Sequence, residues 1–176
     1  MPDYQQIMWQ LYDCPVWAQN LMQCPTVAYS GEIDRQKQAA DVMENRLKEL
    51  GIDLVHIIGP DTAHKIHPDS KIEIESRMTS LADASSSLLP SHIDFTTVTL
   101  RYHRMHWIDV RGLKQHWKPA HVTASVDGST VRVSTENVDR LRIAFPSGQW
   151  PGPAQGSVTL EIDGVSLTGP LVRSDR

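Results

Sequence analysis

The sequence predicts an α/β unit followed by an all-β, sandwich-like domain, because the spacing of its apolar residues changes near the middle of the chain. Up to about residue 82, short apolar runs alternate with stripes of helical period. Beyond residue 92, apolar residues alternate with polar ones, and turn signals recur between the runs. The expected boundaries are 1–84 for the first domain, 85–92 for a linker rich in small polar residues, and 93–176 for the second domain.

The first domain begins with a helical lead-in, expected at 3–12 and 16–22 and interrupted at Pro15. The next element is the apolar run 26–29, which a Ser-Gly pair closes. A short apolar run that ends in glycine is typical of a buried strand. The following stretch, 35–50, carries its apolar residues on one stripe and its charges on the other face, which predicts an amphipathic helix.

A second strand is expected at 54–58, where the run LVHII ends in Gly-Pro. A further helix should begin at Pro68, because proline is favoured as the first helical residue. Strand, helix, strand and helix joined by short connections form a βαβ unit. We therefore expect the two strands to pair in parallel.

The second domain is expected to consist of short strands separated by turns rich in Gly, Pro, Asn and Asp. Alternating residues such as Thr96, Val98, Leu100 and Tyr102 indicate period 2. Such spacing is typical of a small β-sandwich or open barrel. The expected strands are 96–102, 106–110, 121–126, 130–134, 141–145 and 158–162.

The composition excludes several classes of partner. With 176 residues, 40% of them hydrophobic and 22% charged, the chain has the mix of a globular protein. No apolar run approaches the about 20 residues of a spanning helix, so no membrane partner is expected. The formal charge of -4 and the lack of a basic stripe argue against nucleic acid. No signal peptide is expected at residues 1–10, and the composition leaves the compartment open.

Two polar side chains follow the two predicted strands. Asp34 lies in the segment SGEIDRQ, directly after the first strand, and His64 lies in GPDTAHKIHP, directly after the second. Parallel strands deliver such residues to one edge of the sheet, where α/β proteins place their sites. A carboxylate beside a histidine can orient the imidazole and stabilise its charged form while the other ring nitrogen handles a proton. Asp34 and His64 are therefore the candidate catalytic residues.

Simpler roles exist for the same residues. Asp34 can cap the helix expected from Arg35, because aspartate is a preferred N-cap, and a histidine in a loop usually does no more than contact solvent. A metal site formed by His64 and His67 with Glu32 or Asp34 is a further alternative, although a catalytic zinc site needs three well-placed ligands. We expect no metal and no cofactor.

Other residues with reactive or aromatic side chains have weaker cases. His103 and His106 form an H-x-x-H, but residues three apart on a strand point to opposite faces. Trp107, Trp117 and Trp150 offer an aromatic platform, yet filling the core is the more ordinary role of aromatics in strands. The two cysteines, Cys14 and Cys24, are too few for a disulfide framework and are expected to be packing residues.

The segment S-G-E-I-D, with Gln36 and Gln38 beyond it, resembles the H-G-x-x-D segment of prolyl oligopeptidase-type α/β-hydrolases. Gly31 and Asp34 match this segment, while Ser30 replaces the common histidine. The loop that ends in His64, 30 residues after Asp34, is similar to the loop that carries the triad histidine in that family. The resemblance covers residues 1 to about 82 and implies Asp34 as triad acid and His64 as general base.

No G-x-S-x-G nucleophile elbow occurs anywhere in the chain. We therefore expect the C-terminal portion of a serine hydrolase, either a peptidase or an esterase, from a truncated frame, a split gene or a remnant. Alone it should be inactive. A peptide or ester would be its substrate only after completion by an upstream segment with the nucleophile. The exposed edge of its short sheet favours self-association. The alternative is a non-catalytic module whose β-domain binds a polymer or protein.

Overall fold

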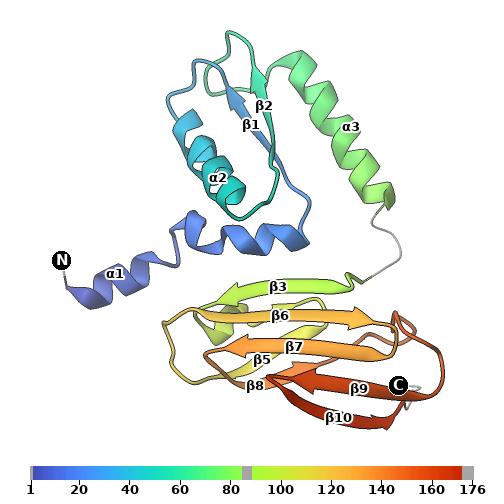
Figure 1. The fold of residues 1–176 in the computed structure, drawn as a ribbon. Coiled ribbons are helices and arrows are strands. Elements are labelled where there is room, and N and C mark those ends of the chain that lie inside the picture. Colours follow the sequence, from blue (N-terminus) through green and yellow to red (C-terminus); the bar gives the residue numbers. More distant parts are fainter. Residues whose placement is uncertain (1, 85–88, 172–176) are drawn as a thin grey trace. The chain divides into compact units, whose positions relative to one another are not determined.

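The computed structural model describes residues 2–84 and 89–171 and contains both helices and several sheets (Figure 1). The chain divides into two compact units, Met1–Ser87 (unit 1) and Leu88–Arg176 (unit 2). This division falls within the predicted linker 85–92. Residues 85–88 of that linker lie outside the described residues, and His92 is already the first residue of a strand. No helix among the described residues is long and apolar enough to span a membrane.

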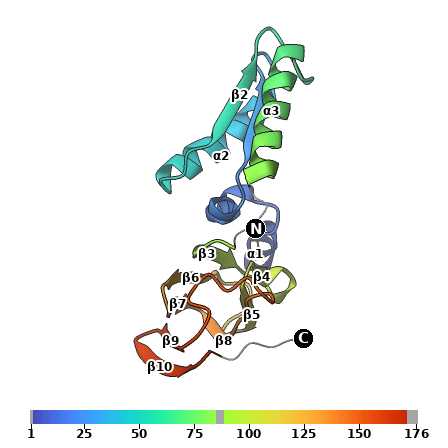
Figure 2. The ribbon, with the colours of Figure 1, turned by 90° about the vertical axis from the view of Figure 1, so that its right-hand side faces the viewer.

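Unit 1 is built on two short parallel strands, β1 and β2, that pair in register from Val27↔Val55 to Gly31↔Gly59. The parallel pairing expected from the βαβ pattern is confirmed. The helices α2 and α3 flank the strand pair (Figures 1 and 2). The elements of unit 1 are α1 (Asp3–Trp9), a 3-10 helix η1 (Cys14–Gln23), β1 (Val27–Gly31), α2 (Lys37–Glu49), β2 (Val55–Gly59) and α3 (Pro68–Ala84).

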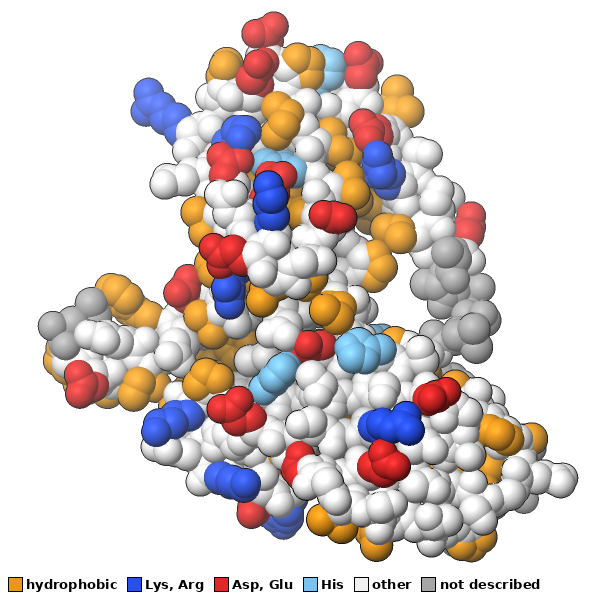
Figure 3. Space-filling model, in the orientation of Figure 1, with side chains coloured by type: hydrophobic (Ala, Val, Ile, Leu, Met, Phe, Trp, Pro, Cys, Tyr) orange, Lys and Arg blue, Asp and Glu red, His pale blue; other side chains and the backbone are white. Residues whose placement is uncertain are grey.

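The core of unit 1 is small. Among its described residues, the buried apolar side chains are those of Ala18, Leu47 and Ile57, whereas Ile72 and Met78 on α3 are 68% and 60% exposed. Apolar side chains accordingly reach the surface of this unit (Figure 3). In the part of the chain that the structure describes, β1 and β2 pair only with each other. Both outer edges of the strand pair therefore carry backbone groups without a neighbouring strand.

Unit 2 contains two sheets that share one core. The five-stranded sheet has the order β10-β9-β7-β6-β3, and the three-stranded sheet has the order β4-β5-β8. Side chains from both sheets form the core, among them Ile93, Val110, Val122 and Val138. The strands are β3 (His92–Thr97), β4 (Arg104–Met105), β5 (Ile108–Leu113), β6 (Ala120–Asp127), β7 (Thr130–Glu136), β8 (Val138–Ile143), β9 (Ser157–Ile162) and β10 (Val165–Pro170).

The predicted strand 96–102 is wrong beyond Thr97. The Thr97 hydroxyl donates to the Thr99 carbonyl, and the Thr99 hydroxyl accepts from the Arg101 amide, which caps a 3-10 helix, η2 (Leu100–Tyr102). Threonine hydroxyls that bond to the nearby backbone compete with the ladder of a sheet, and here they end β3.

Candidate acid–base site

The structure brings Asp34 and His64 together. The paired ends of β1 and β2, Gly31 and Gly59, lead into the two loops that carry these side chains. Asp34 Oδ2 lies 2.9 Å from His64 Nδ1, which is hydrogen-bond distance. The sequence therefore predicted this contact correctly, from the positions of the two residues after neighbouring parallel strands.

The two oxygens of Asp34 have separate partners. Oδ1 accepts a hydrogen bond from the Gln36 amide at 2.9 Å, and Oδ2 contacts His64. The simpler capping role is met in part: Asp34 makes the side-chain hydrogen bond of a capping aspartate to the amide two residues on, but α2 begins at Lys37 rather than at Arg35, so the bond caps the turn that leads into the helix. The first contact fixes the turn before α2, and the fixed turn aims the second oxygen at His64.

These contacts lower the pKa of Asp34 below its ordinary value of 3.8. The hydrogen bond from the Gln36 amide is the largest cause, the hydrogen bond with His64 is the next, and burial acts in the opposite direction. A lowered pKa keeps the carboxylate charged. We therefore assign the Nδ1 hydrogen of a neutral His64 to the contact with Asp34, which leaves a lone pair on Nε2.

The Asp34 titration gives the first testable prediction. In His64→Ala the pKa of Asp34 should rise but stay below its ordinary value, because the Gln36 hydrogen bond remains. The stabilisation from Asp34 is present above its unfolded pKa and is lost as the pH falls through the lower, folded pKa. Carbon NMR of the carboxyl group measures the pKa, and urea unfolding at several pH values measures the stability. His116→Ala, which removes an exposed histidine of unit 2, should leave the titration unchanged.

The outer ring nitrogen of His64 faces open surroundings. The His64 side chain is 76% exposed, whereas that of Asp34 is 12% exposed. Within the described residues, Asp34 is the polar partner that the His64 ring contacts. The pair thus has a half-hidden acid behind an exposed imidazole, and a third group can approach Nε2.

The loop that carries His64 packs directly on the backbone of Gly31. A side-chain Cβ at this position would lie 2.1 Å from the Thr62 carbonyl oxygen and 2.2 Å from that of Ala63. The Ile33 amide donates to the Thr62 carbonyl at 3.1 Å. Glycine is therefore required here by the close approach of two backbones. The resemblance matched Gly31 to a motif, and the packing gives the physical reason for it.

Glu32 is a site residue that the sequence analysis considered only as a metal ligand. Its amide donates to the Gly59 carbonyl, and its carboxylate accepts from the Asp61 amide, both at 2.9 Å. Asp61 has φ 48°, in the left-handed region, so this contact secures a sharp turn at the start of the His64 loop. The sequence offered one signal for Glu32, namely its position two residues before Asp34 in the segment that follows the first strand.

The proposed metal alternative at His64 and His67 does not form. In the described ranges, one group has ligand atoms close enough together for a metal ion, and it consists of Asp41, Glu44 and His56. The Lys37 ammonium already contacts Asp41, so a cation here would have to displace it. This cluster has no signal in the sequence, because its members lie on α2 and β2 and form no motif.

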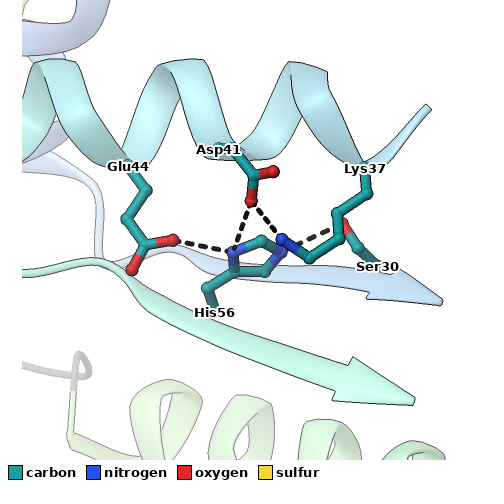
Figure 4. Close-up of polar contacts among 5 residues, drawn as sticks. All are labelled: Ser30, Lys37, Asp41, Glu44 and His56. Carbon is teal, nitrogen blue, oxygen red and sulfur yellow. Dashed lines mark hydrogen bonds and ion pairs between the residues drawn. The ribbon is translucent and has the colours of Figure 1, made fainter. Parts of the chain in front are cut away.

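His56 is the centre of a hydrogen-bonded network (Figure 4). Its Nδ1 lies 2.8 Å from Glu44 Oε2, and its Nε2 lies 2.9 Å from the Ser30 hydroxyl. The order serine, histidine, carboxylate matches that of a catalytic triad. However, Ser30 is 6% exposed and the His56 side chain 5%, so a substrate cannot reach the hydroxyl. The network instead links α2 to β1 and β2.

Three other expectations are corrected or refined in the described residues. His106 lies in a turn with φ 49°, so the strand assumed for the H-x-x-H is wrong. Of the tryptophans, Trp107 is buried and packs on Phe145, whereas Trp117 is 41% exposed. Both cysteines, Cys14 and Cys24, are exposed, so the packing role expected for them is wrong.

Comparison with family models, with curated proteins and with solved structures finds no match to this chain.

Proposed function

We propose that this chain is the C-terminal portion of a serine hydrolase, a peptidase or esterase of the prolyl oligopeptidase type, with Asp34 as triad acid and His64 as general base. Unit 1 would be the last part of an α/β-hydrolase sheet, and unit 2 a sandwich-like domain. The observation that carries this proposal is the 2.9 Å contact between Asp34 and an exposed His64 at the carboxyl ends of neighbouring parallel strands.

The chemistry follows from the two ring nitrogens. The lone pair of His64 Nε2 would take the proton of a serine hydroxyl as its oxygen attacks the substrate carbonyl. The imidazolium would then give this proton to the leaving amine or alcohol as the acyl–enzyme forms. Asp34 would hold the ring in place and stabilise its charged form throughout. A water molecule would then attack the acyl–enzyme while His64 Nε2 takes its proton. The imidazolium would return this proton to the serine oxygen as the acid product leaves.

The serine would come from another polypeptide segment, because the sequence contains no G-x-S-x-G and Ser30 is buried. We propose as partner a polypeptide that carries the nucleophile elbow and is encoded beside this chain. The unpaired outer edge of β1 offers a place for a further strand of that partner. Without the partner, the same edge favours association of two copies of this chain.

Hydrolysis of simple esters and peptides tests the proposal. The chain alone should show no turnover above background and should scatter light as a species larger than its 19.8 kDa. Co-expression with the elbow-bearing polypeptide should give an active complex, called the completed enzyme below. The same complex with the elbow serine replaced by alanine is the matched control. Activity of the isolated chain, or an inactive complex that nevertheless assembles, would contradict the proposal.

A further inference from the structure

A single hydroxyl group holds the segment that directly follows His64. The Tyr29 hydroxyl, on β1, donates to the Lys65 carbonyl at 3.0 Å and accepts from the His67 amide at 2.9 Å. One phenol oxygen therefore serves as donor to one backbone group and as acceptor for another. These contacts span 36 and 38 residues of sequence, so they join the loop to the first strand rather than to its own neighbours.

The last residue of β2, Gly59, leaves room for the Tyr29 phenol. The register pairs Tyr29 with Ile57, which places Gly59 diagonally across from Tyr29 on the same face of the strand pair. A Cβ at Gly59 would lie 2.1 Å from the Tyr29 hydroxyl oxygen. The absence of a side chain at residue 59 thus creates the space in which the tyrosine reaches the loop.

His64 lies between two anchored parts of the same loop. Upstream, the Thr62 carbonyl accepts from the Ile33 amide. Downstream, Tyr29 holds Lys65 and His67. The imidazole itself is 76% exposed and has little packing of its own to fix it. Its direction therefore depends on the backbone on either side as well as on the contact with Asp34.

We propose that Tyr29 is a positioning residue that holds His64 against Asp34 through the backbone of Lys65 and His67. Its value for catalysis rests on the proposed function, whereas the effect on the Asp34–His64 contact stands without it. NMR of the intact chain separates the two, because it reports the contact in the absence of any hydrolysis.

Tyr29→Phe is the direct test, because it removes one oxygen and keeps the ring. The Lys65 carbonyl then loses a donor and the His67 amide loses its acceptor. We expect the His67 amide to exchange its hydrogen about five- to tenfold faster, as for the loss of one hydrogen bond. Asp34→Asn should shift the His64 ring signals strongly in the parent, and by less than about half as much in the Tyr29→Phe background, as in a double-mutant cycle.

Gly59→Ala provides a second variant that keeps the tyrosine but displaces it, since the new Cβ would overlap the hydroxyl. It should reproduce both effects, but its Cβ would also lie 2.9 Å from the Tyr29 Cζ and 3.0 Å from the His67 Cβ, so Tyr29→Phe alone isolates the contribution of the hydroxyl. Tyr12→Phe, at a tyrosine that is 86% exposed, is the matched control and should change neither.

The proposal is overturned if the His64 signals respond to Asp34→Asn equally in the parent and in Tyr29→Phe. That result would contradict it even where the His67 amide exchanges faster, because the loop would then loosen without moving the imidazole. The two proposals can fail separately. If Tyr29→Phe weakens the coupling between Asp34 and His64 but no elbow-bearing partner activates the chain, the role of Tyr29 is supported and only the proposed hydrolase function is contradicted.

Discussion

Replacing His64 by alanine should lower kcat/KM of the completed enzyme by about 10⁴-fold or more. The serine hydroxyl is a weak nucleophile at neutral pH and attacks only when a base removes its proton. In the proposed enzyme, the Asp34 contact would leave the exposed Nε2 of His64 free to act as that base. The variant would retain only the catalysis that substrate binding and an oxyanion hole supply.

Two further variants test whether the loss of kcat/KM is specific to His64. His116→Ala removes an exposed histidine of unit 2 and should leave kcat/KM within about twofold, as expected for a surface change away from the site. The kcat/KM of Asp34→Asn should lie between those of His64→Ala and His116→Ala, because this variant keeps the proposed base but removes the acid that would orient it. Steady-state kinetics on a simple ester measure all three. An His64→Ala enzyme within tenfold of its parent would show that another residue acts as the base.

Gly31→Ala should destabilise unit 1 by about 3 kcal/mol or more, at the upper end of the cost of forcing atoms into a packed interior. The new Cβ would meet the carbonyl oxygens of Thr62 and Ala63 at 2.1 and 2.2 Å. These are backbone atoms, and moving them breaks the bond from the Ile33 amide to the Thr62 carbonyl. The loop would therefore separate from β1 and carry His64 away from Asp34.

Gly169→Ala is the matched control, because it lies in a strand, has no atom within 4 Å of the added Cβ and has no left-handed φ. It should change stability by less than about 1 kcal/mol. Urea titration followed by NMR signals of each unit measures the two variants separately, since the units need not unfold together. Equal unfolding midpoints for unit 1 in both variants would contradict the close packing at Gly31.

The sequence was informative where local pattern and topology determine the outcome. Glycine closes the runs that become β1 and β2, and the helix between them requires a parallel crossover, so the meeting of Asp34 and His64 could be predicted. Their contact needs no knowledge of side-chain packing. The catalytic roles of the two residues stay predictions, because they depend on a serine that this sequence lacks.

Contacts between distant residues could not be predicted in this way. The Ser30–His56–Glu44 network joins three elements across 26 and 12 residues, and Tyr29 reaches across 36, with no spacing rule to reveal either. The strand β10 was also missed. Its sequence did carry the signal of a strand, because Val165 and Leu167 alternate with Ser166 and Thr168 directly after the Asp163-Gly164 turn, although all four residues are exposed.

Labelling with a fluorophosphonate probe, which reacts with an activated serine, tests the central claim most directly. The isolated chain should remain unlabelled, because under the proposal it supplies the acid and the base, and its sequence contains no G-x-S-x-G nucleophile elbow. In the completed enzyme the label should appear on the serine of the partner, and His64→Ala in this chain should abolish it. Labelling of the isolated chain that persists in His64→Ala would contradict the account, because residues other than Asp34 and His64 would then perform the chemistry.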